Sequence, residues 1–292
     1  MKTVKRPASL EEMHELSGSL MFGEGYKRGL LLALRPTDVV ITPYGKSGTT
    51  WTQQIVHTLR TRGDMDFDDI SRVVPWIETS YGLGLDLAAE QKANPRAFKS
   101  HLSWDLVPKG GRYINVVRHP ADVIVSLHKF QEGWFLEPGA VSVDEYAEVE
   151  FLSSRNYFKH LRSWWPRRND PDVLFLAYEK MLLDPTRAIR RIAHFIDIEL
   201  DDELLKITEE HASFDFMLKH KDRFDDAMMR RLSEEVGGLP AGSDSSKVRA
   251  GKVGDGGLLS EETLGQLESA WQEEIASPLG FKSYAALIAE LP

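Results

Sequence analysis

Short apolar runs alternate with longer amphipathic segments along most of the chain. Four runs rich in apolar and β-branched residues predict strands, at residues 39–42, 97–100, 113–117 and 173–176. Helix-like segments separate them, for example at residues 184–196. This alternation predicts an α/β fold in which a central parallel sheet is flanked by helices on both faces.

The chain shows no internal repeat, and no convincing linker precedes Gly237. Its 292 residues would be enough for two domains by length alone, but α/β folds of this size are often single. We therefore expect one domain over residues 1–292, built around one site. Residues 237–257 are rich in Gly, Ser and Asp, which by itself indicates a flexible loop.

The first predicted strand runs into a short loop and then into a helix. The loop reads Gly45-Lys46-Ser47-Gly48-Thr49-Thr50-Trp51. A helix N-terminus leaves backbone N–H groups unpaired and carries partial positive charge, so the amides after Lys46 can hold an anion while its ammonium adds a full charge. Ser47, Thr49 and Thr50 add hydroxyl donors. The sequence therefore favours a phosphate site over a plain capped helix start.

This loop departs from the usual P-loop pattern, because that pattern's first glycine is missing ahead of Gly45 and Lys46. The departure indicates something other than an ordinary NTPase. Trp51 is either a core residue or a flat face for a nucleotide base, and its residue type does not decide between the two.

A second candidate site follows the third predicted strand. Arg118 comes directly after that strand, and Pro120 is a favoured first residue for the helix that follows. Open α/β sheets bind their ligands at the carboxyl ends of strands. Ser126 lies two helical turns beyond Pro120 and can point its hydroxyl toward the same anion. Each residue alone is more often an ion-pair partner or an ordinary helix residue.

Lys99 and His101 close the second predicted strand. A lone histidine is more often structural than catalytic. Neutral imidazole is nevertheless the side chain whose ordinary pKa suits the removal of a proton from an attacking hydroxyl near neutral pH. A further basic segment, Val248-Arg249-Ala250-Gly251-Lys252-Val253-Gly254-Asp255, lies in the Gly-rich region.

Taken together, residues 44–51, 96–108, 113–126 and 248–255 resemble the motifs of the cytosolic-type sulfotransferases, which bind 3'-phosphoadenosine-5'-phosphosulfate (PAPS). The resemblance implies a P-loop-like sulfotransferase fold. It also implies catalytic roles for His101 as the base, Lys46 and Lys99 as charge stabilisers and Ser126 as a residue that steers Lys46. The donor-binding residues it implies are Lys46, Ser47, Gly48, Thr49, Thr50, Trp51, Arg118, Ser126, Tyr178, Ser213, Phe214, Arg249, Ala250 and Gly251.

Within that set, each group is expected to hold one part of the donor. The Lys46 loop would hold the 5'-phosphosulfate, while Arg118, Ser126 and the Arg249 segment would hold the 3'-phosphate. Trp51 and Phe214 would enclose the adenine ring, and Tyr178 and Ser213 would bond its edge.

The chain departs from the family pattern at several positions. Gly45 replaces a common proline, His119 stands inside the Arg-Asn-Pro or Arg-Asp-Pro motif, and Ala212 replaces a common hydroxyl residue. Ala250 and Gly256 replace the lysine and tryptophan usual in the 3'-phosphate clamp, which implies a looser clamp. The segment after Asp255 does not resemble the family's dimerisation stretch, so the oligomeric state stays open.

The composition limits the classes of molecule that this protein can bind and the chemistry that it can use. The formal net charge of −9 argues against a nucleic-acid binder and leaves Lys46, Lys99, Arg118 and Arg249 as a local positive site. The absence of cysteine excludes disulfides and thiol catalysis, and we expect no metal. No apolar run approaches the roughly 18 residues of a membrane span, and the N-terminus is unlike a secretion signal, so a cytoplasmic protein is expected.

We therefore predict in-line transfer of a sulfuryl group from PAPS to a hydroxyl, or less readily an amine, of a small acceptor, leaving 3'-phosphoadenosine 5'-phosphate (PAP). An apolar alcohol or phenol is the expected acceptor, because aromatic residues lie in segments that could line a pocket: Phe22, Trp76, Tyr81, Trp104, Phe130, Trp134 and Phe135.

Two alternatives remain. A P-loop small-molecule kinase would need an acidic residue at a strand end to hold Mg²⁺, whereas the strands here end at Arg118 and Tyr178. A catalytically silent nucleotide-binding protein is the other alternative.

Overall fold

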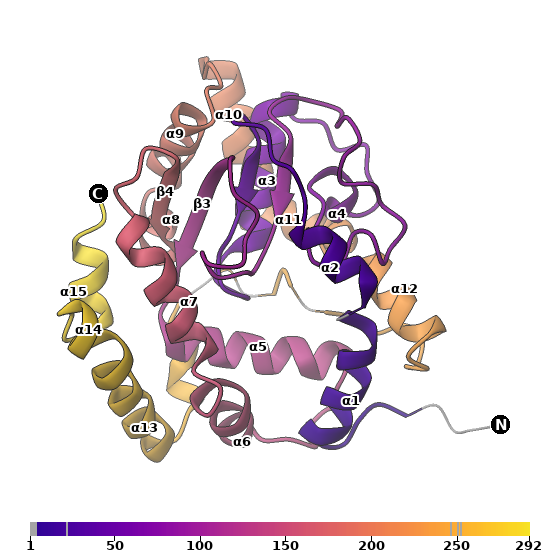
Figure 1. The fold of residues 1–292 in the computed structure, drawn as a ribbon, viewed down its shortest axis with the longest axis vertical. Helices are drawn as coiled ribbons and strands as arrows, with labels where there is room; N and C mark the ends of the chain where they lie inside the picture. The colour runs from indigo at the N-terminus through magenta and orange to yellow at the C-terminus, as the bar shows by residue number, and fades with distance from the viewer. Residues whose placement is uncertain (1–4, 22, 246, 250, 252) are drawn as a thin grey trace.

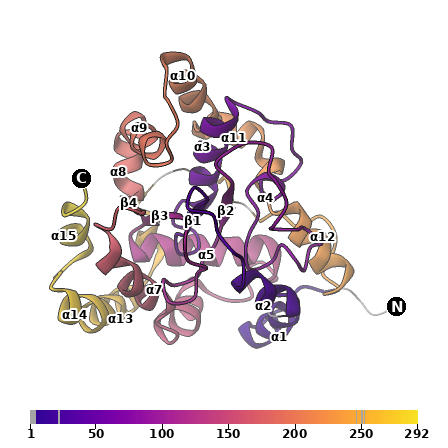
Figure 2. The ribbon, with the colours of Figure 1, turned by 45° about the horizontal axis from the view of Figure 1, so that its top comes forward.

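Four parallel strands form one sheet in the order β2-β1-β3-β4 (Figures 1 and 2). The computed structural model describes residues 5–21, 23–245, 247–249, 251 and 253–292. The strands are β1 (Val39–Ile41), β2 (Ala97–Lys99), β3 (Arg112–Val117) and β4 (Val173–Ala177). Each lies within one residue of the predicted run at either end, so the predicted strands and the parallel sheet are confirmed.

Helices precede and follow the sheet and occupy the connections from β1 to β2 and from β3 to β4, whereas no helix separates β2 from β3. The α-helices are α1 (Leu10–Met21), α2 (Glu24–Leu30), α3 (Thr49–Thr61), α4 (Ile70–Val73), α5 (Pro120–Trp134), α6 (Val143–Tyr146), α7 (Asn156–Trp164), α8 (Tyr178–Leu183), α9 (Pro185–Phe195), α10 (Asp202–His211), α11 (Phe214–Lys219), α12 (Ala227–Glu235), α13 (Glu261–Trp271), α14 (Ser277–Leu279) and α15 (Tyr284–Ala289). Two π-helical turns, η1 (Ala147–Leu152) and η5 (Gln272–Ala276), and three 3₁₀ turns, η2 (Trp165–Arg167), η3 (Lys221–Arg223) and η4 (Asp255–Leu258), complete them.

Alternate strand residues supply two separate cores, one on each face of the sheet. In β3, Ile114 and Val116 join the core made with α3, α4, α8, α9, α10 and α11. Tyr113 and Val117 point the other way, into the core made with α5, α7, α13, α15 and the intervening turns. Both faces are therefore covered, which explains why the strands read as continuous apolar runs.

The first and last helices, α1 and α15, pack onto these layers (Figures 1 and 2). Tyr284 and Leu287 of α15 join the core that also contains residues of α5 and α7. Leu10 and Met13 of α1 form a third core with the end of α5 and with Met229 of α12. Within the described part of the chain, no helix is both long and apolar enough to cross a membrane.

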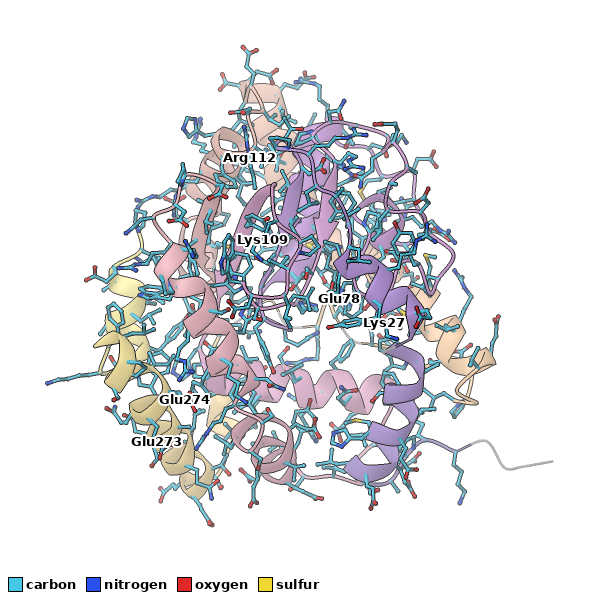
Figure 3. The ribbon with its side chains drawn as sticks, viewed as in Figure 1. Lys27, Glu78, Lys109, Arg112, Glu273 and Glu274 are labelled. Atoms are coloured by element: carbon cyan, nitrogen blue, oxygen red, sulfur yellow. The ribbon has the colours of Figure 1, made fainter. Side chains whose placement is uncertain are left out.

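All four strands are parallel, so their carboxyl ends lie together at one end of the sheet. Arg112, at the amino end of β3, bonds the Phe195 carbonyl oxygen and Asp197 far from that edge, whereas Glu78 lies near the carboxyl ends (Figure 3). The N-termini of α3 and α5 lie where β1 and β3 end, as the chain leaves each strand and enters the next helix. The carboxyl ends of the strands are where α/β folds place their ligands.

Candidate active site

The loop between β1 and α3 has the backbone conformation of an anion cradle. Lys46 adopts a left-handed φ of 62°, unusual for a residue with a side chain, and Gly48 follows at 96°. Gly48 also needs its lack of a Cβ, because one would lie 2.9 Å from the Tyr178 ring. No side chain caps the N-terminus of α3, so its amides stay available to a ligand.

Two hydroxyls in this loop are buried without a protein partner. Ser47 Oγ and Thr49 Oγ1 have no hydrogen-bond partner among the described residues. A buried hydroxyl without a partner is costly, so an anion that accepts from one would relieve that cost. The loop therefore fits the phosphate end of the predicted donor.

Arg118 lies beside this loop at the end of β3. Its Nη1 donates to the Lys46 carbonyl oxygen at 3.1 Å, and its Nη2 lies 3.8 Å from a carboxylate oxygen of Asp122. The guanidinium also lies 4.6 Å from the centre of the Tyr178 ring. These contacts fix a permanent cation next to the cradle.

The predicted clamp segment is anchored to the start of α5. Asp122 accepts the backbone N–H groups of Gly254 and Gly256 at 3.0 and 2.8 Å. Arg249 pairs with Asp255 at 2.7 Å. Gly256, where the family has tryptophan, sits so close to α5 that a Cβ would lie 2.7 Å from the Cβ of Ala121.

His101 is held with one ring nitrogen fixed. Its Nδ1 lies 2.7 Å from the Pro43 carbonyl oxygen, and its backbone N–H donates to Glu78 Oε1 at 2.6 Å. A carbonyl oxygen can only accept, so Nδ1 carries the proton and Nε2 keeps the lone pair. Burial, with Lys99 nearby, lowers the pKa of His101 to about 3, which keeps the ring neutral.

Lys99, which is buried, and Lys46, which is half-buried, each place an ammonium group against an aromatic ring. The Lys99 Nζ lies 3.8 Å from the centre of the Trp76 ring, and the Lys46 Nζ lies 4.8 Å from that of Phe130. Burial lowers the pKa of Lys46 to about 7, with further lowering by Lys247, Arg118 and Lys99. Burial likewise lowers the pKa of Lys99 to about 8, although Asp226 opposes the shift.

The opposite end of the site is aromatic. Trp51 and Tyr178 meet edge to face with ring centres 5.7 Å apart, and Trp51 Nε1 donates to the Ala212 carbonyl oxygen at 2.9 Å. Gly251 lies against Phe214, where a Cβ would come within 2.5 Å of the ring. This arrangement offers flat apolar surfaces of the kind that bind a base.

These parts line one cavity of about 270 Å³. The predicted residues that line it are Lys46, Gly48, Thr49, Thr50, Trp51, Lys99, His101, Arg118, Ser126, Tyr178, Phe214, Arg249 and Gly251. Ser47 and Ser213 do not line it; Ser47 is buried in the loop, and Ser213 Oγ accepts the N–H of Phe216 at 3.2 Å as the cap of α11. Ala250 lies outside the described residues.

The cavity also contains residues that the sequence did not single out. Asp226 and Lys247 form a buried ion pair in its wall, and Leu127, Leu182 and Met217 add apolar surface. Of the predicted aromatic residues, Trp76 and Phe130 line the cavity, whereas Trp134 and Phe135 are buried in the core next to α1. Phe22 lies outside the described residues. No local motif marked Asp226 or Lys247.

Comparison with known proteins agrees with this geometry. A model of the sulfotransferase domain family matches residues 36–269. Dog sulfotransferase 1B1 is 35% identical over 199 residues, which are 63% of this chain and 67% of that protein. Human sulfotransferase 1E1 is 30% identical over 224 residues, which are 71% of this chain and 76% of that protein.

Two solved structures share the fold. Mouse sulfotransferase SULT7A1, complexed with PAP, superposes with a TM-score of 0.69 at 22% identity, over 93% of this chain and 95% of that one. Retinol dehydratase, in complex with androsterone and the inactive cofactor PAP, gives 0.68 at 23% identity, over 91% of this chain and 94% of that one.

A parallel sheet with an uncapped helix N-terminus and basic side chains at the carboxyl ends of its strands is the arrangement of the P-loop-like nucleotide-binding class. The chain belongs to the sulfotransferase domain family. The predicted sulfotransferase fold and enzyme class are thus confirmed. The enzyme moves a sulfuryl group from PAPS, and nothing favours the kinase alternative.

Proposed function

We propose that this enzyme sulfates a small apolar alcohol or phenol, with His101 as general base and the Lys46 loop holding the donor. The observation that carries the proposal is the state of His101. It lines the cavity as a neutral ring whose Nδ1–H is committed to Pro43, so Nε2 is the nitrogen whose lone pair is left to accept a proton.

Each basic group then has a separate task. His101 Nε2 would accept the hydroxyl proton of the acceptor. Lys46, Lys99 and the α3 amides would stabilise negative charge on the transferring group and the departing phosphate oxygen. The bound donor supplies the sulfuryl group on a phosphate leaving group. Arg118, Ser126 and Arg249 would hold its 3'-phosphate, and Trp51 and Phe214 its adenine.

Ser126 fits a supporting role. It lies on α5 one turn before Phe130, whose ring the Lys46 ammonium overlies. A hydroxyl at this point of α5 can compete with the donor for Lys46. Ser126 is therefore proposed to steer Lys46 until an acceptor is present. Ser126→Ala should weaken PAP binding, because Ser126 is also expected to hold the 3'-phosphate, and it should raise hydrolysis of the donor in the absence of acceptor.

The acceptor side of the cavity is apolar. The Trp76 ring lies edge to face with His101 at 5.4 Å between ring centres, and Leu127 and Phe130 line the same cavity. Retinol dehydratase, which shares the fold, is described with androsterone, and another structure of it with retinol. Both molecules are apolar alcohols, which supports the same acceptor class here.

The whole chain is proposed to act as one cytoplasmic domain. Residues outside the family match, among them Leu32 and Leu287, pack into the same core as the sheet. Cell fractionation would test the location, and limited proteolysis would test whether residues 1–292 resist cleavage as a unit.

A transfer assay with sulfur-labelled PAPS tests the proposal directly. Phenols, sterols, amines and glycolipids would be compared as acceptors. We expect turnover with a phenol or sterol, and Leu127→Ala should raise its KM while the affinity for PAP stays unchanged. Turnover with amines alone would contradict the acceptor class, and binding of PAP without turnover on any acceptor would support a silent binder.

A further inference from the structure

The cavity contains a buried ion pair that the proposed roles leave unused. Lys247 Nζ contacts Asp226 Oδ2, and both side chains are less than a tenth exposed. The other oxygen of Asp226 lies 3.8 Å from the Lys99 ammonium and 3.4 Å from the Ser71 hydroxyl. One carboxylate therefore holds two ammonium groups inside the active site.

The backbone is bent to bring Asp226 there. Asp226 adopts a left-handed φ of 48° just before α12, a conformation that costs energy for a residue other than glycine. Its neighbour Asp225 bonds Arg230 at 2.7 Å and the Ser245 N–H at 2.9 Å. Asp225 thus already anchors the segment that carries Lys247. Anchoring this segment therefore does not explain why Asp226 is buried in contact with Lys247.

Stability does not explain the pair either. Removing two charges from water costs more than many buried ion pairs return, and apolar replacements are often as stable. Lys46, Lys99, Lys247 and Arg118 all line this one cavity, with Asp226 among them. A cavity with this excess of buried cations is suited to an anionic ligand.

Resting on the proposed function, we propose that Lys247 is a third ammonium group of the transfer centre, facing the phosphosulfate end of the donor together with Lys46 and Lys99. Asp226 is the positioning residue that holds Lys247 and Lys99 in place. The ligand class is a phosphosulfate or phosphate anion.

The electrostatic surroundings predict opposite effects for the two partners. The charged groups that face Lys46 are Lys247, Asp226, Arg118 and Lys99, and those that face Lys99 are Asp226, Lys247, Glu78 and Asp69. In both cases Lys247 lowers the pKa of the lysine and Asp226 raises it. Removing Lys247 therefore raises both pKa values, whereas removing Asp226 lowers them.

The test is PAP affinity measured by calorimetry between about pH 5.5 and 9. Wild-type affinity should fall through the range in which Lys46, at a pKa of about 7, and Lys99, at about 8, lose their protons. For Lys247→Met, affinity at pH 6 should drop about tenfold and the fall should move to higher pH. For Asp226→Asn the fall should move to lower pH. Ionisation of PAP itself is common to all variants.

Matched controls come from the exposed pair Lys221 and Asp244, 3.0 Å apart, which joins the same two segments at the surface. Lys221→Met and Asp244→Asn should leave the profile unchanged. Lys247→Arg should keep most of the affinity because it keeps the charge. A drop in kcat for Lys247→Met that Lys247→Arg restores would place Lys247 at the reacting end.

Each outcome decides. The inference would be overturned if the pH profiles of Lys247→Met and Asp226→Asn shift in the same direction, or if neither profile shifts. The proposed function would still stand in that case, provided that the wild type binds PAP. Failure of the wild type to bind PAP would overturn both. If a single variant does not fold, the double variant Lys247→Met with Asp226→Asn replaces it. In the double variant the two opposite effects on the lysine pKa values cancel, so the pH profile should not shift. A loss of PAP affinity of about tenfold in this variant supports the inference, and an affinity equal to that of the wild type overturns it.

Discussion

The Nδ1 atom of His101 lies 2.7 Å from the carbonyl oxygen of Pro43, the residue that leads from β1 into the phosphate loop. This contact joins the proposed base to the donor cradle through two adjacent strands, β1 and β2. It fixes both the orientation and the tautomer of the imidazole. The proposed base and the proposed donor loop are therefore both positioned by the carboxyl ends of β1 and β2.

His101→Ala tests the base at a single side chain. The change removes the imidazole and its bond to Pro43 but none of the side chains or amides proposed to hold the nucleotide, so PAP binding should stay near normal. The value of kcat should fall by about 10² to 10⁴-fold, the usual contribution of general-base catalysis. His194 and His220 lie outside the cavity and serve as controls when changed to Ala. Retention of most activity in His101→Ala would place the base elsewhere.

The pH profile of kcat/KM for the donor should lack the acid limb of an ordinary histidine. A base with a pKa near 6.5 would lose about tenfold activity by pH 5.5. Burial lowers the pKa of His101 to about 3, so the ring stays neutral there and this loss should be absent. The basic limb should begin near neutrality, because Lys46 and Lys99 must be protonated and have pKa values of about 7 and about 8. Initial rates at subsaturating donor would check both limbs, and a tenfold acid loss by pH 5.5 would contradict the assignment.

Much of this site could be predicted from sequence because its parts lie at strand ends. Lys46, Lys99 and Arg118 follow or close neighbouring parallel strands, and parallel strands bring their carboxyl ends together whatever the connections are. Asp226 and Lys247 could not be found in this way. Their contact depends on the path of a long segment after α11, and no periodic pattern specifies which charges meet there. Ser213 illustrates a different difficulty, because its position was predicted but its residue type fits two roles. A serine is equally suited to cap a helix and to bind a base edge.

The 3'-phosphate should dominate nucleotide selectivity. PAP should bind at least tenfold more tightly than 5'-AMP, because a charge-assisted contact contributes roughly 1.5 to 3 kcal/mol. Arg118→Met should remove most of this difference while changing 5'-AMP affinity little. Arg112→Met is the control, since Arg112 lies at the opposite end of the same strand (Figure 3). If calorimetry finds equal affinities for PAP and 5'-AMP in the wild type, the predicted contacts to the 3'-phosphate are wrong.

Transfer should not need a divalent metal. Among the described residues, no three or more His, Asp or Glu side chains gather in a way that could hold an ion. The ammonium groups and the α3 amides would stabilise the developing charge instead. Rates measured in EDTA should match those in Mg²⁺. Complete loss in EDTA that added Mg²⁺ restores would instead indicate a metal-dependent mechanism.

Gly251→Ala tests the adenine end of the cavity. The new Cβ would lie 2.5 Å from Cδ2 of Phe214, so the ring has to move away from the position in which it would cover the base. Loss of one aromatic contact should weaken PAP and 5'-AMP equally, by about three- to tenfold, since both contain the adenine. Gly242→Ala is the matched control. Gly242 has a comparable left-handed φ of 84° against 58° for Gly251, but a Cβ there meets nothing within 4 Å. Backbone strain alone would affect folding in both variants, whereas nucleotide affinity should fall only in Gly251→Ala. If calorimetry finds the same affinity in the two variants, Phe214 does not cover the base.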